Sequence, residues 1–318
     1  MQEKELRFNL NDILNPDCLT NCDREKRKKI TNDNICNELS SVVDGLPIRC
    51  VRSWAKEKIY LLTQYFGIFA QGMYKLWENN IVYIEICSGP GRCIDRESGF
   101  EFDGTPLTII KKPEYKYIKK ALFFDFDLSI VDTLNKRLNN NNNAVSLYGD
   151  YNNPDDLCKK INQEVPGKNL YFVFIDPTDC SIPFSTIMKI KENLRSVDLL
   201  INIATGTDFN RNAKNIINNP DSYKMLINKY EYFLNSEGIF KNDKFTRLVE
   251  NNDNENIRNY FREIYQQSLE NIGYNFFDYT PIEHYYDLLF ASASKTGLSL
   301  WKKATKSIDV SGQRSLFI

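Results

Sequence analysis

Apolar runs of strand length recur through the middle of the chain, separated by segments in which apolar residues return at helical spacing. We expect strands at residues 81–87, 120–125, 144–148, 169–175 and 197–203. Runs that are apolar throughout indicate strands covered on both faces, and their alternation with helices predicts a parallel sheet. The predicted fold class is therefore α/β, a Rossmann-like and mostly parallel sheet.

The helices are predicted from the same periodicity. Apolar residues from about Val51 to Glu78 indicate one long amphipathic helix, with a break at Gly67 left open. A helix start is expected at residues 104–107, and further helices are expected at residues 127–138, 154–163 and 184–193.

The two ends of the chain differ from this alternation. Residues 1–50 are polar and irregular, and we interpret them as a cysteine-containing extension to one domain formed by residues 51–318. Within that domain, residues of about 208–272 are polar and of helical character, which predicts a helical insertion.

Strand character returns near the carboxyl terminus. Residues Tyr274–Tyr279 and Tyr285–Ala291 predict two late strands joined by a short turn at Pro281. Together they should form an antiparallel edge on the sheet.

Acidic residues or glycine turns end the first four predicted strands. Glu85 precedes the turn Cys87-Ser88-Gly89-Pro90-Gly91, and the next three strands end at Asp125, Asp150 and Asp176. A parallel α/β sheet binds its ligand at the carboxyl ends of its strands. The pattern therefore predicts a single pocket to which all four strand ends contribute.

The glycine turn favours one class of cofactor. Gly89 and Gly91 allow a close approach of the backbone to a ligand, but Ile94 stands where a dinucleotide motif requires a third glycine. A carboxylate at Glu85 would repel a pyrophosphate and can accept hydrogen bonds from an ammonium group. S-adenosylmethionine is therefore favoured over a nicotinamide dinucleotide.

The next two strand ends suit a nucleoside. Asp125 can accept hydrogen bonds from both ribose hydroxyls, and Asp127 is either a second ligand or the N-cap of the following helix. Asp150, after Gly149, can accept from the exocyclic amine of adenine or can form an Asx turn with the asparagines that follow.

The fourth strand end is the candidate catalytic site. Pro177 fixes the backbone after Asp176, so the carboxylate can orient an acceptor nitrogen, with Thr178 beside it. A simple strand-end turn is the alternative interpretation.

Composition and charge narrow the function further. The 318 residues are 42% hydrophobic, and 41 basic against 42 acidic residues leave a formal charge of −1, so no global field attracts nucleic acid. No run is long and apolar enough to span a membrane, and the charged amino terminus lacks a signal-peptide core, so we expect a soluble, cytoplasmic protein.

Cysteine and histidine chemistry is not expected to carry the function. The eight cysteines should be reduced thiols, although Cys18, Cys22, Cys36 and Cys50 leave a zinc site as a weaker alternative. The single histidine, His284, is interpreted as structural, which argues against hydrolase and histidine-metal sites. No metal is expected.

Several motifs resemble the three-Cys-motif partner (TcmP) family over roughly residues 50–305. The resemblance is carried by these segments: residues 51–58 with a Trp and a Lys on the leading helix, Tyr65, residues 83–92, residues 104–107, Phe124-Asp125, Gly149-Asp150, residues 174–177, and residues 286–292 with Gly297 and Trp301. It implies a class I methyltransferase fold, and it leaves the acceptor open. Glu85 replaces the more common aspartate, and Cys87 stands where glycine is frequent.

Together these observations predict an S-adenosylmethionine-dependent methyltransferase-like protein. The candidate cofactor-binding residues are Glu85, Cys87, Ser88, Gly89, Pro90, Gly91, Asp125, Asp127, Gly149, Asp150 and Tyr151, and the candidate catalytic residues are Asp176, Pro177 and Thr178. The acceptor could be an amino group of a nucleic-acid base, although Thr178 and Asp179 replace the proline and aromatic ring that would stack a flipped base. Protein and small-molecule acceptors stay open. The alternative is a non-catalytic nucleotide-binding partner or scaffold of the same fold.

Overall fold

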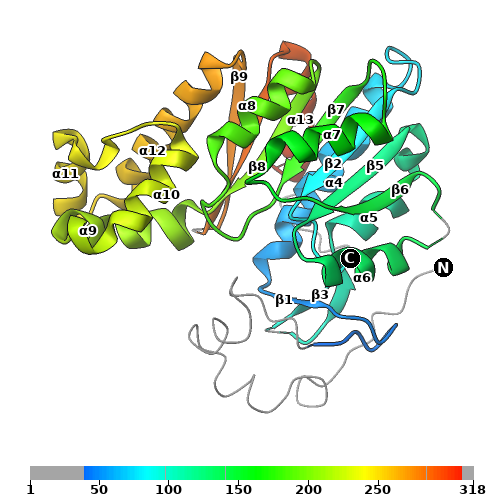
Figure 1. The fold of residues 1–318 in the computed structure, drawn as a ribbon, viewed down its shortest axis with the longest axis horizontal. Helices are drawn as coiled ribbons and strands as arrows, with labels where there is room; N and C mark the ends of the chain where they lie inside the picture. The colour runs from blue at the N-terminus through cyan, green and yellow to red at the C-terminus, as the bar shows by residue number, and fades with distance from the viewer. Residues whose placement is uncertain (1–38, 97, 140, 284, 310–318) are drawn as a thin grey trace.

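A computed structural model describes residues 39–96, 98–139, 141–283 and 285–309 of the chain. Its centre is a seven-stranded sheet in the order β6-β5-β2-β7-β8-β10-β9 (Figure 1). The strands are β2 (Ile81–Ile86), β5 (Lys120–Asp125), β6 (Ala144–Tyr148), β7 (Leu170–Ile175), β8 (Val197–Ile203), β9 (Phe276–Ile282) and β10 (Tyr286–Ser292).

Strand direction identifies the fold. The pairs among β6, β5, β2, β7 and β8 are parallel, whereas β10 is antiparallel to both β8 and β9. The chain builds outward from β2 to β6 and then returns to the other side of β2 at β7. A last strand inserted antiparallel beside the fifth completes the Rossmann-like class I methyltransferase fold. Ligands of such sheets bind where the strand order reverses, here between β2 and β7.

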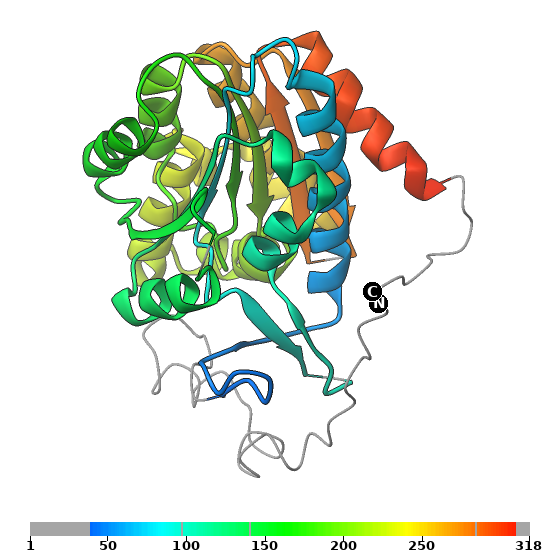
Figure 2. The same ribbon diagram turned by 90° about the vertical axis from the view of Figure 1, so that its right-hand side faces the viewer.

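Helices cover both faces of the sheet (Figure 2). Those of the main domain are α4 (Trp54–Met73), α5 (Thr105–Lys111), η1 (Pro113–Tyr117), α6 (Leu128–Arg137), α7 (Pro154–Glu164), α8 (Phe184–Asn193) and α13 (Lys295–Asp309). On one face α4 packs between α5 and α13, and α7 and α8 lie together on the other. Among the described residues, no helix is both long and apolar enough to cross a membrane.

An aromatic cluster joins α4 to the sheet and to the last helix. The Tyr65 ring lies 4.9 Å from Phe172 of β7, 5.1 Å from Phe290 of β10 and 5.5 Å from Trp301 of α13. Trp301 is fully buried, and its indole N–H donates to Asp278 over 2.8 Å. These contacts on the amphipathic face of α4 hold the helix against the sheet. They thereby fix its first turns, which reach the predicted pocket.

The helical insertion follows β8 and extends away from the sheet (Figure 1). It comprises η2 (Thr205–Asn210), α9 (Arg211–Asn218), η3 (Pro220–Tyr223), α10 (Lys224–Leu234), η4 (Ile239–Lys241), α11 (Asp243–Glu250) and α12 (Asn254–Asn271). It has an aromatic core of its own, in which Phe209 packs 4.1 Å from Phe261 and Phe233 stacks 4.7 Å from Tyr265.

A small second sheet lies across the carboxyl ends of the parallel strands (Figure 2). It is formed by β1 (Arg49–Val51), β3 (Arg92–Asp95) and β4 (Glu101–Asp103), with β3 central. Arg92 of β3 pairs with Glu101 and Asp103 of β4. The sheet was not predicted from the sequence, because its strands are three or four residues long and two of them are half-buried.

The predicted strands of the parallel sheet are confirmed to within a residue or two, and so is the antiparallel carboxyl-terminal edge, in which β10 is antiparallel to β8 and to β9. Helix α4 is continuous through Gly67; a Cβ there would lie 3.4 Å from the Glu114 carboxyl carbon, so the glycine serves close packing. The expected turn at Pro281 is wrong, because Pro281 pairs with Asp287 inside β9. Helix α13 was not predicted.

The aromatic cluster gives a test of the core. Trp301→Ala should lower the free energy of unfolding by about 3–5 kcal/mol, because it removes a fully buried ring. Denaturant unfolding measures the loss, and Trp77→Ala at a half-buried position is the control, with a smaller expected effect. Equal losses in the two variants would show that the cluster around Tyr65 does not hold the last helix.

Candidate functional site

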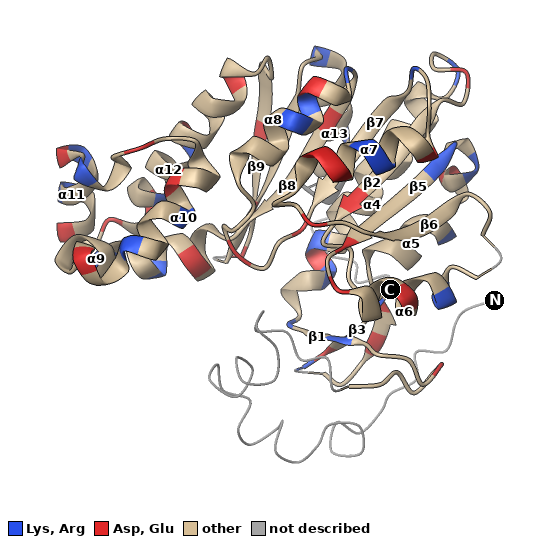
Figure 3. Ribbon diagram, in the orientation of Figure 1, with Lys and Arg blue, Asp and Glu red and all other residues tan. Residues whose placement is uncertain are grey.

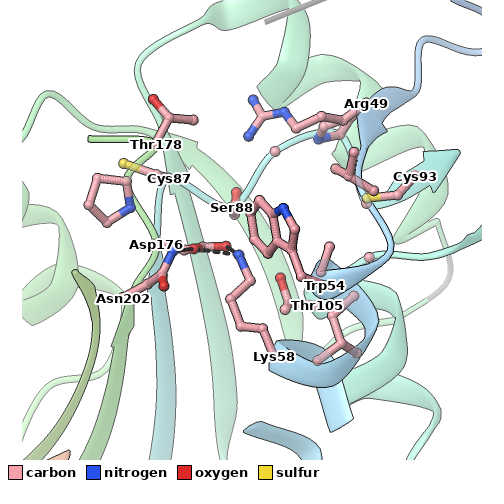
Figure 4. Close-up of a pocket in the computed structure, with 18 of the residues that line it drawn as sticks. Arg49, Trp54, Lys58, Cys87, Ser88, Cys93, Thr105, Asp176, Thr178 and Asn202 are labelled. Atoms are coloured by element: carbon pink, nitrogen blue, oxygen red, sulfur yellow. Dashed lines mark hydrogen bonds and ion pairs between the residues drawn. The ribbon is translucent and has the colours of Figure 1, made fainter. Parts of the chain in front are cut away.

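A cavity lies at the carboxyl end of the sheet, where the strand order reverses (Figure 4). Its walls come from the turn after β2 (residues 87–91, the glycine turn), the loop after β7 (residues 176–183, the β7 loop), the first turns of α4, the end of β8, the start of β10 and the small sheet. Its lining includes Arg49, Trp54, Lys58, Cys87, Ser88, Gly89, Gly91, Asp176, Asn202 and Tyr286. The cavity thus brings together the first and fourth predicted strand ends.

A buried ion pair forms one wall of the cavity. Lys58 Nζ lies 2.6 Å from Oδ1 and 2.5 Å from Oδ2 of Asp176, with side chains 10% and 16% exposed. Asn202 Nδ2 donates to the same Oδ1 over 2.8 Å. The backbone N–H of Asp176 donates to the carbonyl of Ile86, which ties the end of β7 to the end of β2. The carboxylate is thereby held in one orientation.

Sequence reasoning missed Arg49 and Asn202 as site residues and used Lys58 only as part of a family motif. Lys58 follows Trp54 by one helical turn on α4, and its ammonium lies 5.6 Å from the Trp54 ring. Asn202 interrupts the apolar run of β8, which was the available signal. Arg49 carried no signal, because the strand that positions it is recognisable only in three dimensions.

The glycine turn is sharply bent. Cys87, Gly89 and Gly91 have φ values of +65°, +68° and +90°. A non-glycine residue in this left-handed region stores about 1–3 kcal/mol of strain, so Cys87 is held there by the surrounding structure. A Cβ on Gly91 would come within 2.8 Å of Leu134, and one on Gly89 would lie 3.3 Å from the Arg49 guanidinium. Only glycine therefore fits the packing at Gly91. At Gly89 the absence of a Cβ lets the Arg49 guanidinium lie close against the turn.

Glu85 lies beneath the turn and outside the cavity lining. Its carboxyl group is fully buried and accepts hydrogen bonds from Tyr83, over 3.0 Å, and from Thr105. Burial raises the pKa of Glu85 from 4.5 to about 8, with a smaller contribution from Asp176, against the opposing effect of the hydrogen bonds and Lys58. The group is therefore mostly protonated near neutral pH and links β2 to the start of α5.

Asp125 and Asp127 lie at the end of β5. Asp125 is buried directly behind the glycine turn, where Oδ2 accepts from Gly89 N over 3.0 Å and Oδ1 accepts from Asp127 N over 3.2 Å. Asp127 caps α6 by accepting from Ser129 N over 2.8 Å, as one of its two predicted roles requires. Neither residue lines the cavity.

Asp150 lies at the end of β6, one strand further out. Its Oδ1 accepts from Asn152 N over 2.8 Å, which forms the Asx turn, and Tyr151 bonds Ser181 of the β7 loop. A Cβ on Gly149 would lie 2.7 Å from the Phe124 ring, so only glycine fits there. The structure leaves these residues on the same edge of the sheet as Asp125 but outside the cavity lining.

Apolar side chains are exposed beside these acids. Phe126, Leu128 and Tyr148 are exposed next to Asp125 and Asp150 in the sequence. Hydrophobic and aromatic side chains with a few polar groups are the usual lining of a small-molecule site.

Two buried polar atoms test whether the cavity fits an amino-acid cofactor. Arg49 Nε and Ser88 Oγ are buried at the glycine turn without a hydrogen-bond partner among the described residues. A guanidinium and a hydroxyl are donors that complement a carboxylate. Together with the close backbone approach at Gly89, they fit the methionine end of S-adenosylmethionine.

The helical insertion anchors the β7 loop. Asp208 of η2 accepts from the backbone N–H of Cys180 over 3.0 Å, and Lys229 of α10 lies 2.6 Å from Asp208 and 3.2 Å from Asp179. Burial alone would raise the pKa of Asp208. The charge of Lys229 and the hydrogen bonds that the carboxylate accepts keep that pKa below its ordinary value. The loop that carries Asp176 is thus held at its first residue by the bond to Ile86 and near its middle by the insertion.

The thiols of the site are poor nucleophiles. Burial raises the pKa of Cys87 and Cys180, and it raises that of Cys93 to about 11. Cys87, Cys93, Cys158 and Cys180 are free thiols. Among the residues that the structure describes, no group of His, Cys, Asp and Glu side chains could hold a metal ion. The predictions for Cys18, Cys22, Cys36 and His284 fall outside the described residues.

The chain matches no protein-family model and no curated protein. Among solved structures it is similar to the fibrillarin pre-rRNA processing protein of Methanococcus jannaschii, with 12% identity, a TM-score of 0.37 and 67% of each chain covered. It is also similar to human N-acetylserotonin methyltransferase in complex with SAM, with 12% identity and a TM-score of 0.35, where 73% of this chain covers 52% of that one.

A third similar structure is protein LPL1258 of Legionella pneumophila, with 9% identity, a TM-score of 0.41 and coverage of 78% of this chain and 92% of that one. At such TM-scores these likenesses carry no argument of their own. The fold assignment rests on the order and direction of the strands.

The buried carboxyl of Glu85 predicts a pH dependence of stability. Because its folded pKa is raised from 4.5 to about 8, the folded state retains a proton that the unfolded state loses between these values. Stability should therefore fall as pH rises from about 5 to 8, and Glu85→Gln should remove that part of the fall. We expect the variant to gain at least about 1 kcal/mol on the wild type across this range, or roughly 2–4 °C in Tm.

Melting curves at several pH values measure the difference between variant and wild type. Glu192→Gln, at an exposed position on α8, is the control and should track the wild type. A difference between Glu85→Gln and the wild type that is the same at pH 5 and pH 8 would show that Glu85 is ionised in the folded protein.

Proposed function

We propose that this protein binds S-adenosylmethionine and transfers its methyl group to an acceptor at the β7 loop. The observation that carries the proposal is the meeting, where the strand order reverses, of the unpartnered donors Arg49 Nε and Ser88 Oγ with the fixed carboxylate of Asp176. A cavity with such a convergence of polar groups at the carboxyl end of an α/β sheet is the expected place for a ligand. The resemblance to the TcmP family belongs to the same proposal.

Residues of the cavity and of the neighbouring strand ends share the cofactor in this proposal. Arg49 and Ser88 hold the carboxylate of the methionine part, and the glycine turn lets the backbone approach it. Asp125 accepts from the ribose hydroxyls in addition to its bond from Gly89, and Asp150 accepts from the adenine amine. When bound, the cofactor supplies an electrophilic methyl group on a sulfonium centre.

Asp176 positions the acceptor. A carboxylate offers about four lone-pair sites, and Lys58 uses two and Asn202 one. One site is left for an N–H or O–H of the acceptor. Its proton would pass to the carboxylate as the bond from nitrogen or oxygen to the methyl carbon forms and the sulfur–methyl bond breaks, which would leave S-adenosylhomocysteine. Pro177 and Thr178 form the rest of the wall toward the acceptor.

The acceptor is an amino group of a nucleic-acid base or of another molecule. Basic and acidic residues are interspersed over the described elements (Figure 3), in keeping with the formal charge of −1. A polyanionic substrate would have to be held by local contacts, because no overall field attracts it.

A nucleotide-binding scaffold without catalysis is the second candidate. The observation in its favour is the bidentate ion pair, because the Lys58 ammonium competes with an acceptor for the Asp176 oxygens. The two candidates share the cofactor site and differ only in transfer.

Cofactor binding should depend on Asp125. Removing a charge-assisted hydrogen bond costs about 1.5–3 kcal/mol, so Asp125→Ala should weaken binding of S-adenosylhomocysteine at least tenfold in calorimetry. Asp132→Ala, an exposed acid on the following helix, is the control and should bind as the wild type does. Absence of heat with wild-type protein would overturn the proposal, and equal affinity of Asp125→Ala would remove Asp125 from the site.

Transfer should depend on Asp176. Asp176→Asn should leave cofactor affinity within a few fold and lower transfer about 100-fold, because the neutral amide does not take up the proton of the acceptor. Label from methyl-labelled cofactor is followed into the nucleic-acid, protein and small-molecule fractions of cell extract. Asp198→Asn, a buried acid at the opposite end of β8, is the matched control and should label normally.

Two results would change the assignment. Equal labelling by wild type and Asp176→Asn would exclude Asp176 from transfer. Tight cofactor binding without label in any fraction would support the scaffold.

A further inference from the structure

Asn202 presents a hydrogen-bond acceptor whose orientation is fixed. The side chain lies at the end of β8 in the cavity wall and is 1% exposed. Its Nδ2 donates to Asp176 Oδ1 over 2.8 Å. Since a carboxylate oxygen only accepts, the amide nitrogen must face Asp176, and the amide oxygen must point away from it.

That amide oxygen has no donor. Asn202 Oδ1 is buried and lacks a hydrogen-bond partner among the described residues. An acceptor left in this state costs about 1–3 kcal/mol, so the protein retains it against its own stability. Asn202 itself lines the cavity at which Asp176 and Lys58 meet.

Some neighbouring buried polar groups beyond the cavity are satisfied, as Thr205 is by donating to Asp287 over 2.7 Å. Thr207 Oγ1 and Asn210 Oδ1 of η2 also lack a partner among the described residues. Of these three unpaired atoms at the end of β8 and in η2, only Asn202 Oδ1 belongs to a residue that lines the cavity.

We propose that Asn202 Oδ1 accepts a hydrogen bond from the nucleophile that this site methylates, so that the acceptor group carries an N–H or O–H. The inference rests on the proposed methyl transfer. The amide oxygen adds a second acceptor to the one lone-pair site left on Asp176, and a primary amino group has two hydrogens to donate. A carbanion or a thiolate has no hydrogen to donate and would leave both unpaired. A site with buried polar groups rejects such a substrate strongly.

The analogue sinefungin tests the proposal without an identified acceptor. It carries an amine on carbon in place of the methyl-bearing sulfonium of S-adenosylmethionine, and so presents N–H donors where the methyl group would be. S-adenosylhomocysteine has the same remaining parts and no such donor. The ratio of the two affinities therefore reports how the site receives a charged N–H donor at the point of transfer.

In calorimetry the wild type should bind sinefungin about tenfold more tightly than S-adenosylhomocysteine, the usual effect of a hydrogen bond from a charged donor. Asn202→Leu, of similar volume but without an acceptor, should lose about tenfold of that preference and keep its affinity for S-adenosylhomocysteine within about threefold. Asn202→Asp should retain the preference, because it keeps an acceptor oxygen. Both variants remove the donor to Asp176, so loss of that donor cannot explain a difference between them, and the Asp variant differs from the Leu variant by an acceptor oxygen and a charge.

The outcomes separate this inference from the proposed function. If S-adenosylhomocysteine and sinefungin both fail to bind the wild type, the proposed function falls and the inference falls with it. If both bind but Asn202→Leu retains the wild-type preference, the role of Asn202 alone is overturned. Should the Leu variant not fold, Asn202→Ala replaces it, and a loss of preference in Asn202→Asp would equally contradict the proposal.

Discussion

The candidate site depends on one ion pair, between Lys58 of α4 and Asp176 at the end of β7. Two groups that are 118 residues apart in the chain come within 2.6 Å, in a wall where both side chains are mostly buried. Burying charges is costly unless they are paired and hydrogen-bonded, so removing either partner would leave an unpaired charge. The pair therefore fixes the first turns of α4 against the sheet, and with them the ring of Trp54, which lies 4.4 Å from that of Tyr286.

The acids at the strand ends differ in the groups that compensate for their burial. Asp176 has a cation, Asp125 accepts from the backbone of the glycine turn, and Glu85 has only hydroxyl donors in direct contact and retains its proton to a higher pH. Asp176 is thus an oriented anion, Asp125 stabilises the glycine turn, and Glu85 is a neutral hydrogen-bonding link to α5. Distance to a compensating group, more than position at a strand end, decides which chemistry each acid can perform.

Elements outside the central sheet complete the cavity. The small sheet places Arg49 over Gly89, and the helical insertion holds the β7 loop through Asp208 and Lys229. The π-helical turn η2 contacts both the β7 loop and the segment before β10. It follows β8 directly and carries Asp208, and its Gly206 and Thr207 amides both donate to the carbonyl of Tyr285. Such turns are frequent at functional sites. A change in the insertion would therefore reach both the β7 loop and the start of β10.

Apolar runs and helical periodicity were enough to predict the parallel strands, the main helices and the insertion, because burial on both faces of a sheet imposes an unbroken apolar pattern. The glycine turn and the Asp176 strand end were predicted as one site for the same reason, since parallel strands end at one edge. The partners of those residues could not be read from the chain. Lys58, Asn202 and Arg49 become site residues only because α4, β8 and β1 converge on the end of β7 and the glycine turn, and long-range packing decides that convergence.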